Sequence, residues 1–318
     1  MAHANHSVLV LGGGPDAERE VSLKSAHFIA LALRESGRFS AVHSQTIDKL
    51  TLEELKRLPG DVIFPALHGG WGEGGPLQDL LEADGRPFVG CKARAARHAM
   101  DKVATKLTAV QLGIPTPACR VLDLRDSACP LPFPVIVKPV HEGSTVGLHV
   151  CRNAEEWSAA RRTIEAERAT PKGDRCYMVE SCISHPTRKK ARELTVGIID
   201  NQPLPVIEIP PADGLYDYEA KYTRNDTVYT VAPGLPGRIT ETIQRQTADL
   251  AKAMNIRHLA RTDFMLDGEG PDAIAWFLEI NTLPGFTDHS LVPMAARHVG
   301  LPMPALCAKL IDLAWRDR

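Results

Sequence analysis

Apolar and polar positions follow two different periods in the first third of the chain. Short apolar runs at Ser7–Leu11 and Asp61–Pro65 predict buried strands, whereas Glu18–Glu35 has apolar residues at helical spacing. The run QDLLEADG, residues 78–85, also predicts a helix. Strands that alternate with helices are typical of βαβ units, so this part of the chain predicts a parallel sheet. We expect the first domain to end near Arg94.

The remaining two thirds mix strands and helices in a less regular order. Helices are expected over Met100–Gly113, over residues 155–169 and near Thr240–Met254. Between and after them, the pattern predicts strands at residues 133–140, 148–152, 176–183, 193–199, 203–211, 259–266 and 277–281. Residues 212–236 lack a regular pattern, and a loop of about that length is usually functional or disordered.

Composition and charge narrow the class of protein. A chain of 318 residues with 44% hydrophobic and 24% charged residues is typical of a soluble globular protein of two or three domains. The net charge of −2 argues against nucleic acid or an anionic membrane as a partner. No apolar run approaches the roughly 18 residues of a membrane span, and the N-terminus lacks the features of a signal peptide. Seven scattered cysteines without a C-x-x-C motif favour reduced thiols, so we expect a cytoplasmic protein.

Oxygen ligands cluster near the end of the strand FLEIN, residues 277–281. Glu279 and Asn281 are two residues apart, so their side chains lie on the same face of this strand. Asp263 lies on the strand before it, across the hairpin-like segment DGEGPDA. If the two strands pair, the three side chains converge as hard ligands that suit Mg²⁺ or Mn²⁺. A solvated strand face is the alternative, but the apolar flanking residues favour partial burial, and buried carboxylates need partners.

A second polar cluster follows the strand that ends near Lys138. The turn EGSTVG supplies Gly143, Ser144 and Gly147, so a lysine stands beside a run of exposed backbone N–H groups. This pattern favours binding of nucleotide phosphates, although a plain β-turn is the simpler alternative. It is not a Walker A motif, because the chain contains no G-x-x-x-x-G-K-[ST] sequence.

Two further glycine-rich segments are weaker signals. GGGPDA, residues 12–17, fits the dinucleotide fingerprint G-x-G-x-x-A, but no clear acidic strand end follows about 20 residues later. HGGW, residues 68–71, is similar to the oxyanion loop of lipases, but the chain lacks a G-x-S-x-G elbow. We therefore favour neither a dinucleotide-binding protein nor a hydrolase.

Taken in order, the motifs of this chain resemble those of a known family. The blocks are GGxxxEREVSLxSA, HGxxGExG, MDK, VKP, EGSxVG, YDYEAKY, RxDF, LEINTLPG and HSLVPMAA, and they extend from Val8 to about Leu313. They are similar to the D-alanine–D-alanine ligases of the ATP-grasp superfamily. The resemblance implies an α/β fold with α+β lobes, in which a Rossmann-like parallel-sheet domain precedes an ATP-grasp fold. The implied domains are residues 1–94, 95–184 and 185–318.

The resemblance also implies a role for individual residues. Asp263, Glu279 and Asn281 match the ligands of two Mg²⁺ or Mn²⁺ ions. The implied ATP-binding residues are Lys102, Lys138, Glu180, Ser181, Ile183, Glu193 and Lys221. The implied substrate-binding residues are Glu18, His68, Arg261, Gly285, Ser290 and Leu291. The implied catalytic residues are Glu18, Ser144, Tyr222 and Arg261.

The reaction that the resemblance implies has two steps. The carboxylate of one D-alanine attacks the γ-phosphate of ATP, and the amine of a second D-alanine then attacks the acyl phosphate. Arg261 would stabilise the developing oxyanion. The segment Tyr216–Tyr222 would form part of a lid, and Tyr222 favours an amine acceptor over a hydroxy acid. The product would be a peptidoglycan precursor, and the family suggests a homodimer.

Three departures from the family pattern leave other functions open. Asp16 replaces a serine, Gly74 replaces an acid, and Asp79 stands where glycine is common, all near the motifs implied for the first substrate. The linker SHPTRKK, residues 184–190, is longer than expected. The alternatives are an ATP-grasp ligase that joins other small amino acids, and a nucleotide-binding paralogue without turnover.

Overall fold

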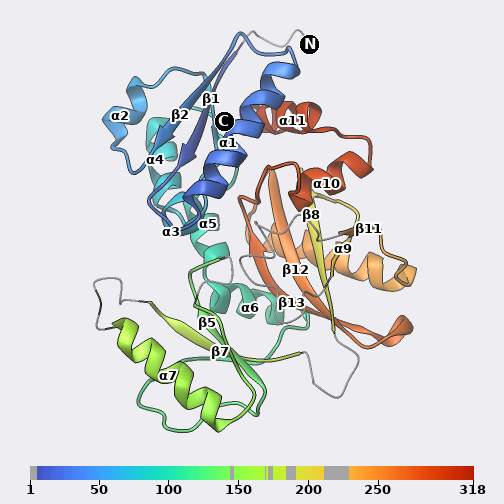
Figure 1. The fold of residues 1–318 in the computed structure, drawn as a ribbon. Coiled ribbons are helices and arrows are strands. Elements are labelled where there is room, and N and C mark those ends of the chain that lie inside the picture. Colours follow the sequence, from blue (N-terminus) through green and yellow to red (C-terminus); the bar gives the residue numbers. More distant parts are fainter. Residues whose placement is uncertain (1–5, 144–146, 169, 171–174, 184–190, 211–228) are drawn as a thin grey trace.

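The computed structural model describes residues 6–143, 147–168, 170, 175–183, 191–210 and 229–318. These residues form three sheets that follow one another along the molecule (Figure 1). The first sheet lies at the end where both termini are found, and the four-stranded sheet lies at the opposite end (Figure 1).

The first sheet is parallel, as the alternation of strands and helices predicted. Its order is β2-β1-β3, with β1 at Ser7–Gly13, β2 at Ala41–Ile47 and β3 at Val62–Pro65. Helix α1 (Arg19–Glu35) packs against β1 and β2. The pattern also predicted α4 (Pro76–Asp84), but it did not identify β2, α2 (Leu52–Arg57) or α3 (Gly69–Glu73).

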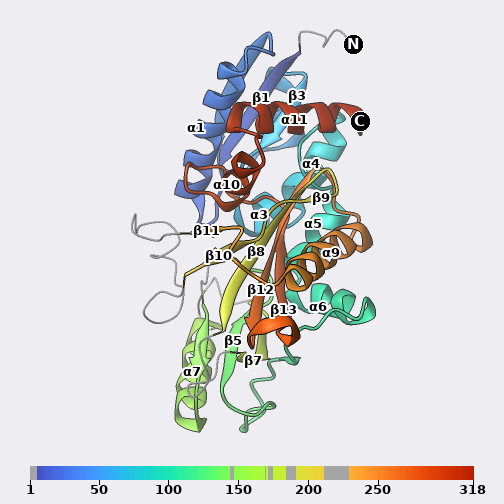
Figure 2. The same ribbon diagram turned by 90° about the vertical axis from the view of Figure 1, so that its right-hand side faces the viewer.

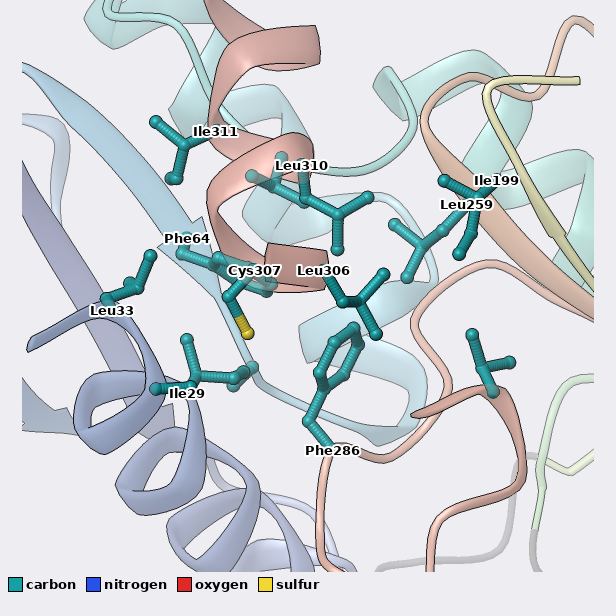
Figure 3. Packing of buried hydrophobic residues seen from close by; sticks show 14 of the residues in the cluster. Ile29, Leu33, Phe64, Ile199, Leu259, Phe286, Leu306, Cys307, Leu310 and Ile311 are labelled. Atoms are coloured by element: carbon teal, nitrogen blue, oxygen red, sulfur yellow. The ribbon is translucent and has the colours of Figure 1, made fainter. Parts of the chain in front are cut away.

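The last helix of the chain packs against α1 and β3 and so returns to this first sheet. Helix α10 spans Leu291–His298 and α11 spans Met303–Arg316. Figure 3 shows the apolar side chains of α11 against those of α1 and β3, with Cys307 and Ile311 on the side of Ile29 and Phe64. All four side chains are buried. The first core is therefore built from both ends of the chain.

The second sheet is antiparallel and has the order β4-β7-β5-β6. Its strands are β4 (Cys119–Val121), β5 (Val135–Pro139), β6 (His149–Cys151) and β7 (Tyr177–Ser181). Helix α7 (Ala154–Arg168) covers one face and buries Trp157. The sequence pattern predicted every strand of this sheet except β4, which is only three residues long.

The third sheet is also antiparallel and carries the order β11-β10-β8-β12-β13. Its strands are β8 (Arg192–Ile199), β10 (Ile207–Ile209), β11 (Thr230–Val231), β12 (Leu259–Asp267) and β13 (Ile274–Asn281), and β9 (Gln202–Pro203) pairs with β8. A 3₁₀ turn, Gly270–Asp272, lies between β12 and β13. Helix α9 (Gly237–Ala253) lies on one side of this sheet (Figure 2).

The helix expected over Met100–Gly113 is confirmed as α6 (Lys102–Gln111), and a second helix that the pattern did not identify, α5 (Ala93–Met100), directly precedes it. The break falls at Asp101, whose backbone is extended and whose carboxylate accepts hydrogen bonds from the N–H groups of Val103 and Ala104 at 2.9 and 3.0 Å. Because this side chain satisfies donors that have no partner within the helix, it fixes the start of α6. Helix α6 packs against β13 and α9.

Helices long and apolar enough to cross a bilayer were not found among the residues that the structure describes.

The core shared by both chain ends should be sensitive to truncation. We expect Leu310→Ala, at a fully buried position, to lower the free energy of unfolding by about 2–5 kcal/mol through the lost burial and the remaining cavity. The matched control is Leu31→Ala on α1, where the side chain is 46% exposed. Urea unfolding of both variants measures the difference, and equal losses would contradict the packing described here.

A buried histidine should make stability depend on pH. His258 is 3% exposed, its Nδ1 accepts a hydrogen bond from the Gly90 N–H at 3.0 Å, and burial lowers its pKa from 6.5 to about 4. Between pH 4 and pH 6.5 the His258 imidazole is mostly protonated in the unfolded chain and mostly neutral in the folded protein. The folded state is therefore favoured above pH 6.5 and loses this advantage as the pH falls, by about 2 kcal/mol at pH 5.

The variant His258→Asn isolates this contribution. Asparagine tolerates the left-handed backbone conformation found here, with φ at 67°, and keeps an acceptor for the Gly90 N–H without titrating. We expect the variant to lose less stability than the unmodified protein between pH 7 and pH 5 in urea unfolding. A parallel loss in both proteins would show that His258 does not cause the pH dependence.

Candidate active site

A pocket with polar walls lies where the first and third sheets meet the turn after β5. It is lined by residues of the third sheet, of the segments that follow β1 and β3, and of the segment before α10. Most of the residues expected in the site lie here, namely Glu18, His68, Glu193, Arg261, Asp263, Glu279, Asn281, Gly285, Ser290 and Leu291. Side chains from distant parts of the chain thus meet in one place.

The pairing of β12 with β13 creates the acidic part of the pocket. In this antiparallel pair Asp263 lies opposite Glu279, and Arg261 lies opposite Asn281, so the expected pairing of the two strands is confirmed. Arg261 Nη2 donates to Asp263 Oδ2 at 2.9 Å, and Thr195 Oγ1 on β8 donates to Asp263 Oδ1 at 2.6 Å. A guanidinium and a hydroxyl therefore hold the Asp263 carboxylate, which is only 6% exposed.

The oxygen atoms of this strand pair fit a hard divalent cation. Asn281 Oδ1 accepts a hydrogen bond from the Leu283 N–H at 2.8 Å, which orients the amide and leaves one lone pair of the oxygen free. Among the described residues, no group of three or more His, Cys, Asp or Glu side chains could hold a metal ion. The fitting set is two carboxylates with one amide oxygen, and such sets suit Mg²⁺ when phosphate oxygens complete the shell.

Lys102 stands beside these ligands at the start of α6. Its Nζ donates to the backbone carbonyl of Glu142 and lies 3.4 Å from Glu279 Oε2. It lines a smaller pocket that shares Glu279, Asn281 and Glu73 with the larger one. The ammonium group is therefore placed between the turn after β5 and the end of β13.

Glu180 and Lys138 form a buried ion pair on adjacent strands β7 and β5. Burial opposes ionisation of both, yet the lysine charges lower the pKa of Glu180, and the carboxylates of Glu180 and Glu279 raise the pKa of Lys138. Ser181 ends β7 and Ile183 follows it, and the Ser181 N–H donates to the carbonyl of Ala118 at 2.9 Å. This end of β7 carries three of the residues that the resemblance implies for ATP binding.

Two buried titratable groups, His68 and Glu73, lie where the segment after β3 lines the pocket. Burial lowers the pKa of His68 to about 4, so its imidazole is neutral at pH 7, with Nε2 3.4 Å from Ser25 Oγ. Burial and the nearby carboxylate of Glu18 raise the pKa of Glu73 to about 8. Glu73 Oε1 accepts a hydrogen bond from the Gly69 N–H at 3.1 Å. Near neutral pH the protonated Glu73 therefore adds little negative charge beside Glu18.

The N-terminus of α10 faces the pocket through Ser290 and Leu291. Ser290 Oγ accepts a hydrogen bond from the Thr287 N–H at 2.8 Å, which fixes the turn before the helix. A Cβ at Gly285 would lie 2.9 Å from Ser290 Oγ, so a larger residue there would have to displace the serine side chain. A helix N-terminus presents unpaired N–H groups and a positive dipole, so this corner suits a carboxylate.

The departures from the family pattern lie in different places. Asp16 Oδ2 accepts a hydrogen bond from the Trp71 N–H at 3.0 Å, and Asp16 lines a neighbouring pocket that shares Glu18 with the candidate site. Asp79 instead pairs with Arg97 at an exposed position. Neither Gly74 nor Asp79 lines these pockets, so Asp16 is the departure closest to the candidate site.

Some site residues were not identified from the sequence, and others lie outside the described part of the chain. The expected residues Ser144, Lys221 and Tyr222 and the linker 184–190 lie outside the described residues. The site residues that the sequence did not identify are Glu73, Lys106, Thr195, Tyr229, Thr287 and His289. The spacing of four residues between Lys102 and Lys106 was a usable signal, because it places both lysines on one face of a helix.

Comparisons with known proteins agree with this arrangement. The family model described as "D-ala D-ala ligase C-terminus" matches residues 123–312. The D-alanine–D-alanine ligase of Stutzerimonas stutzeri is 41% identical over 309 residues, which cover 96% of this chain and 93% of that protein. The corresponding ligase of Nitrosomonas europaea is 38% identical over 314 residues and 96% of each chain.

Solved structures show the same similarity. The D-alanine–D-alanine ligase of Bacillus anthracis in complex with ATP superposes with a TM-score of 0.79 at 26% identity, over 98% of each chain. The ligase of Coxiella burnetii gives a TM-score of 0.80 at 26% identity, over 99% of this chain and 95% of that one. These matches confirm the ATP-grasp fold class with its N-terminal parallel sheet, and the chain belongs to the D-alanine–D-alanine ligase family.

Proposed function

We propose that this protein is an enzyme that joins two D-alanine molecules to D-alanyl-D-alanine with cleavage of ATP to ADP and phosphate. The observation that carries this proposal is the single pocket in which Asp263, Glu279 and Asn281 meet Arg261 and the N-terminus of α10. The named relatives are D-alanine–D-alanine ligases along almost the whole chain, and one solved relative holds ATP. The product would be a precursor of peptidoglycan.

The nucleotide would lie between the second and third sheets. Lys102 and Lys138 would supply ammonium groups for the phosphates, and Glu193 in the pocket would bind a ribose hydroxyl. The end of β7, with Glu180, Ser181 and Ile183, would contact the adenine. Asp263, Glu279 and Asn281 would hold two Mg²⁺ or Mn²⁺ ions, which neutralise charge on the transferred phosphoryl group when bound.

The first D-alanine would lie at the end of the pocket with Glu18 and His68. Glu18 would bind its ammonium group, and the neutral His68 imidazole adds no competing positive charge. The carboxylate oxygen attacks the γ-phosphorus, the bond to the bridging oxygen breaks, and ADP leaves with that electron pair. Arg261 faces the same space and would stabilise the negative charge on the acyl phosphate.

The second D-alanine would place its carboxylate at the N-terminus of α10, near Ser290 and Leu291. Gly285 keeps this corner open, because it carries no side chain. The free amine attacks the carbonyl carbon of the acyl phosphate and forms the peptide bond. The C–O bond to phosphate breaks, phosphate leaves with the electron pair, and the nitrogen loses a proton.

A second candidate function is the ligation of other small amino acids. It is motivated by Asp16, which lines the pocket next to Glu18 and is a departure from the family pattern. Its carboxylate already accepts a hydrogen bond from the Trp71 N–H. We therefore place D-alanine ligation first, since Asp16 has a local structural role that does not need a different substrate.

We further propose a cytoplasmic homodimer whose chain divides into domains 1–94, 95–184 and 185–318. The division is supported by the three sheets, which follow these ranges in order. Family resemblance supports the dimer, with the first domain at the interface. Sedimentation equilibrium at micromolar protein should give twice the mass of the 34.7 kDa chain, and a monomer mass would overturn the dimer.

A single carboxylate substitution tests the proposed metal site. We expect Glu279→Gln to reduce the rate of ADP release at least about a hundredfold, because the amide cannot replace the charge of a metal ligand. The matched control is Glu241→Gln on the exposed side of α9, which should keep the full rate. Similar rates for Glu279→Gln and the unmodified protein would contradict the role of Glu279.

Substrate choice separates the two candidate functions. Purified protein with ATP and Mg²⁺ should release ADP with D-alanine alone, and mass spectrometry should show D-alanyl-D-alanine. L-alanine and D-serine test the second candidate function, and a mixture of D-alanine with D-lactate tests a hydroxy-acid acceptor. A stronger response to another pair would favour the second candidate. Binding of ATP without ADP release for any substrate would indicate a paralogue without turnover.

A further inference from the structure

A buried lysine stands behind the nucleotide side of the candidate site. Lys106 lies on α6, one turn after Lys102, and is only 2% exposed. None of the steps proposed above uses it. Burying an ammonium group is unfavourable unless close partners compensate its charge, so the contacts of this side chain reveal what it stabilises.

The partners of Lys106 belong to two different sheets. Its ammonium group forms an ion pair with Glu180 on β7. It also donates a hydrogen bond to Thr116 Oγ1 at 2.8 Å, and that hydroxyl donates to the backbone carbonyl of Phe277 on β13 at 2.8 Å. Phe277 precedes the metal-ligand candidate Glu279 by two residues. Lys106 therefore connects β7 of the second sheet with β13 of the third.

Glu180 is shared between two lysines. One oxygen of its carboxylate pairs with Lys106 and the other pairs with Lys138. The side chain of Glu180 is 3% exposed, so water does little to screen these contacts. Two ammonium groups and one carboxylate leave a net charge of +1 in the cluster. Without Lys106 the cluster would be neutral, and Glu180 would hold Lys138 alone.

The backbone near Thr116 makes the same connection. The Phe277 N–H donates to the carbonyl of Pro115 at 2.8 Å, and the Ser181 N–H donates to the carbonyl of Ala118 at 2.9 Å. The segment 115–118 thus runs between β13 and β7, and Lys106 packs beside it from α6. In both views α6 lies next to β13, with the second sheet following along the molecule (Figures 1 and 2).

We propose that Lys106 is a positioning residue for the nucleotide. It orients Glu180, and through Glu180 it orients Lys138, and it fixes both against the strand that carries Glu279. Lys106 joins the two strands that would act on the same ATP molecule. The net positive charge of the cluster also favours a polyanion in front of it. This inference rests on the proposed binding of ATP.

The test compares ATP binding by Lys106→Met with that of the unmodified full-length protein. Methionine fills a similar volume and removes the charge. We expect the Kd for ATP with Mg²⁺, measured by calorimetry without amino acid, to rise about tenfold, whereas the KM for D-alanine changes less than about twofold. The matched control is Lys252→Met, which removes one charge from an exposed position on α9 and should leave both constants unchanged.

A second variant covers the case in which Lys106→Met does not fold. Thr116→Val keeps every charge but removes the hydrogen bond that anchors Lys106 to β13. We expect a smaller rise in the Kd for ATP, about two- to threefold, in the same direction. An unchanged Kd in the folded variants would overturn the positioning role of Lys106. Failure of the unmodified protein to bind ATP would instead overturn the proposed function, so the two failures are distinguishable.

Discussion

The candidate site depends on the antiparallel register that places Asp263 opposite Glu279. Two carboxylates on neighbouring strands repel each other, and partial burial makes their charges more costly than in water. The surrounding structure answers this with cations on either side, since Arg261 pairs with Asp263 and Lys102 lies 3.4 Å from Glu279. The positive charges of Arg261 and Lys102 therefore offset the cost of placing the two carboxylates side by side on these strands.

Ion pairs between these carboxylates and lysines connect parts of the chain that are far apart in sequence. Lys102 comes from α6, Lys138 and Glu180 come from the second sheet, and the acidic ligands come from the third. The segment before α10, which leads to the proposed carboxylate site at Ser290, also contacts the first domain. Ser25 Oγ on α1 accepts a hydrogen bond from the Phe286 N–H at 3.2 Å. The return of α11 to the first core holds this site in place. Packing of the chain ends and geometry of the site are thus coupled.

The local pattern of apolar residues was sufficient to predict elements whose buried side chains recur at a regular spacing. It predicted the parallel first sheet, β12, β13 and the convergence of Asp263 with Glu279. It did not reveal β2, whose residues are half-exposed at a sheet edge, or β4, which has three residues. Helix α11 also contacts the segment just after α1, where Arg38 pairs with Asp312 across 274 positions of sequence, and no local pattern encodes such a contact. The family motifs supplied the site residues that periodicity could not.

Helix α6 shows how one local signal organises several of these contacts. Asp101 caps the helix and fixes its start at Lys102. Because Lys106 follows by four residues, it lies on the same face one turn further along. One lysine then reaches the acidic end of β13 and the other reaches Glu180 on β7. A helix over Met100–Gly113 without the break at Asp101 would have no such fixed starting point. The Asp101 cap therefore helps to position Lys102 and Lys106, in addition to stabilising the helix.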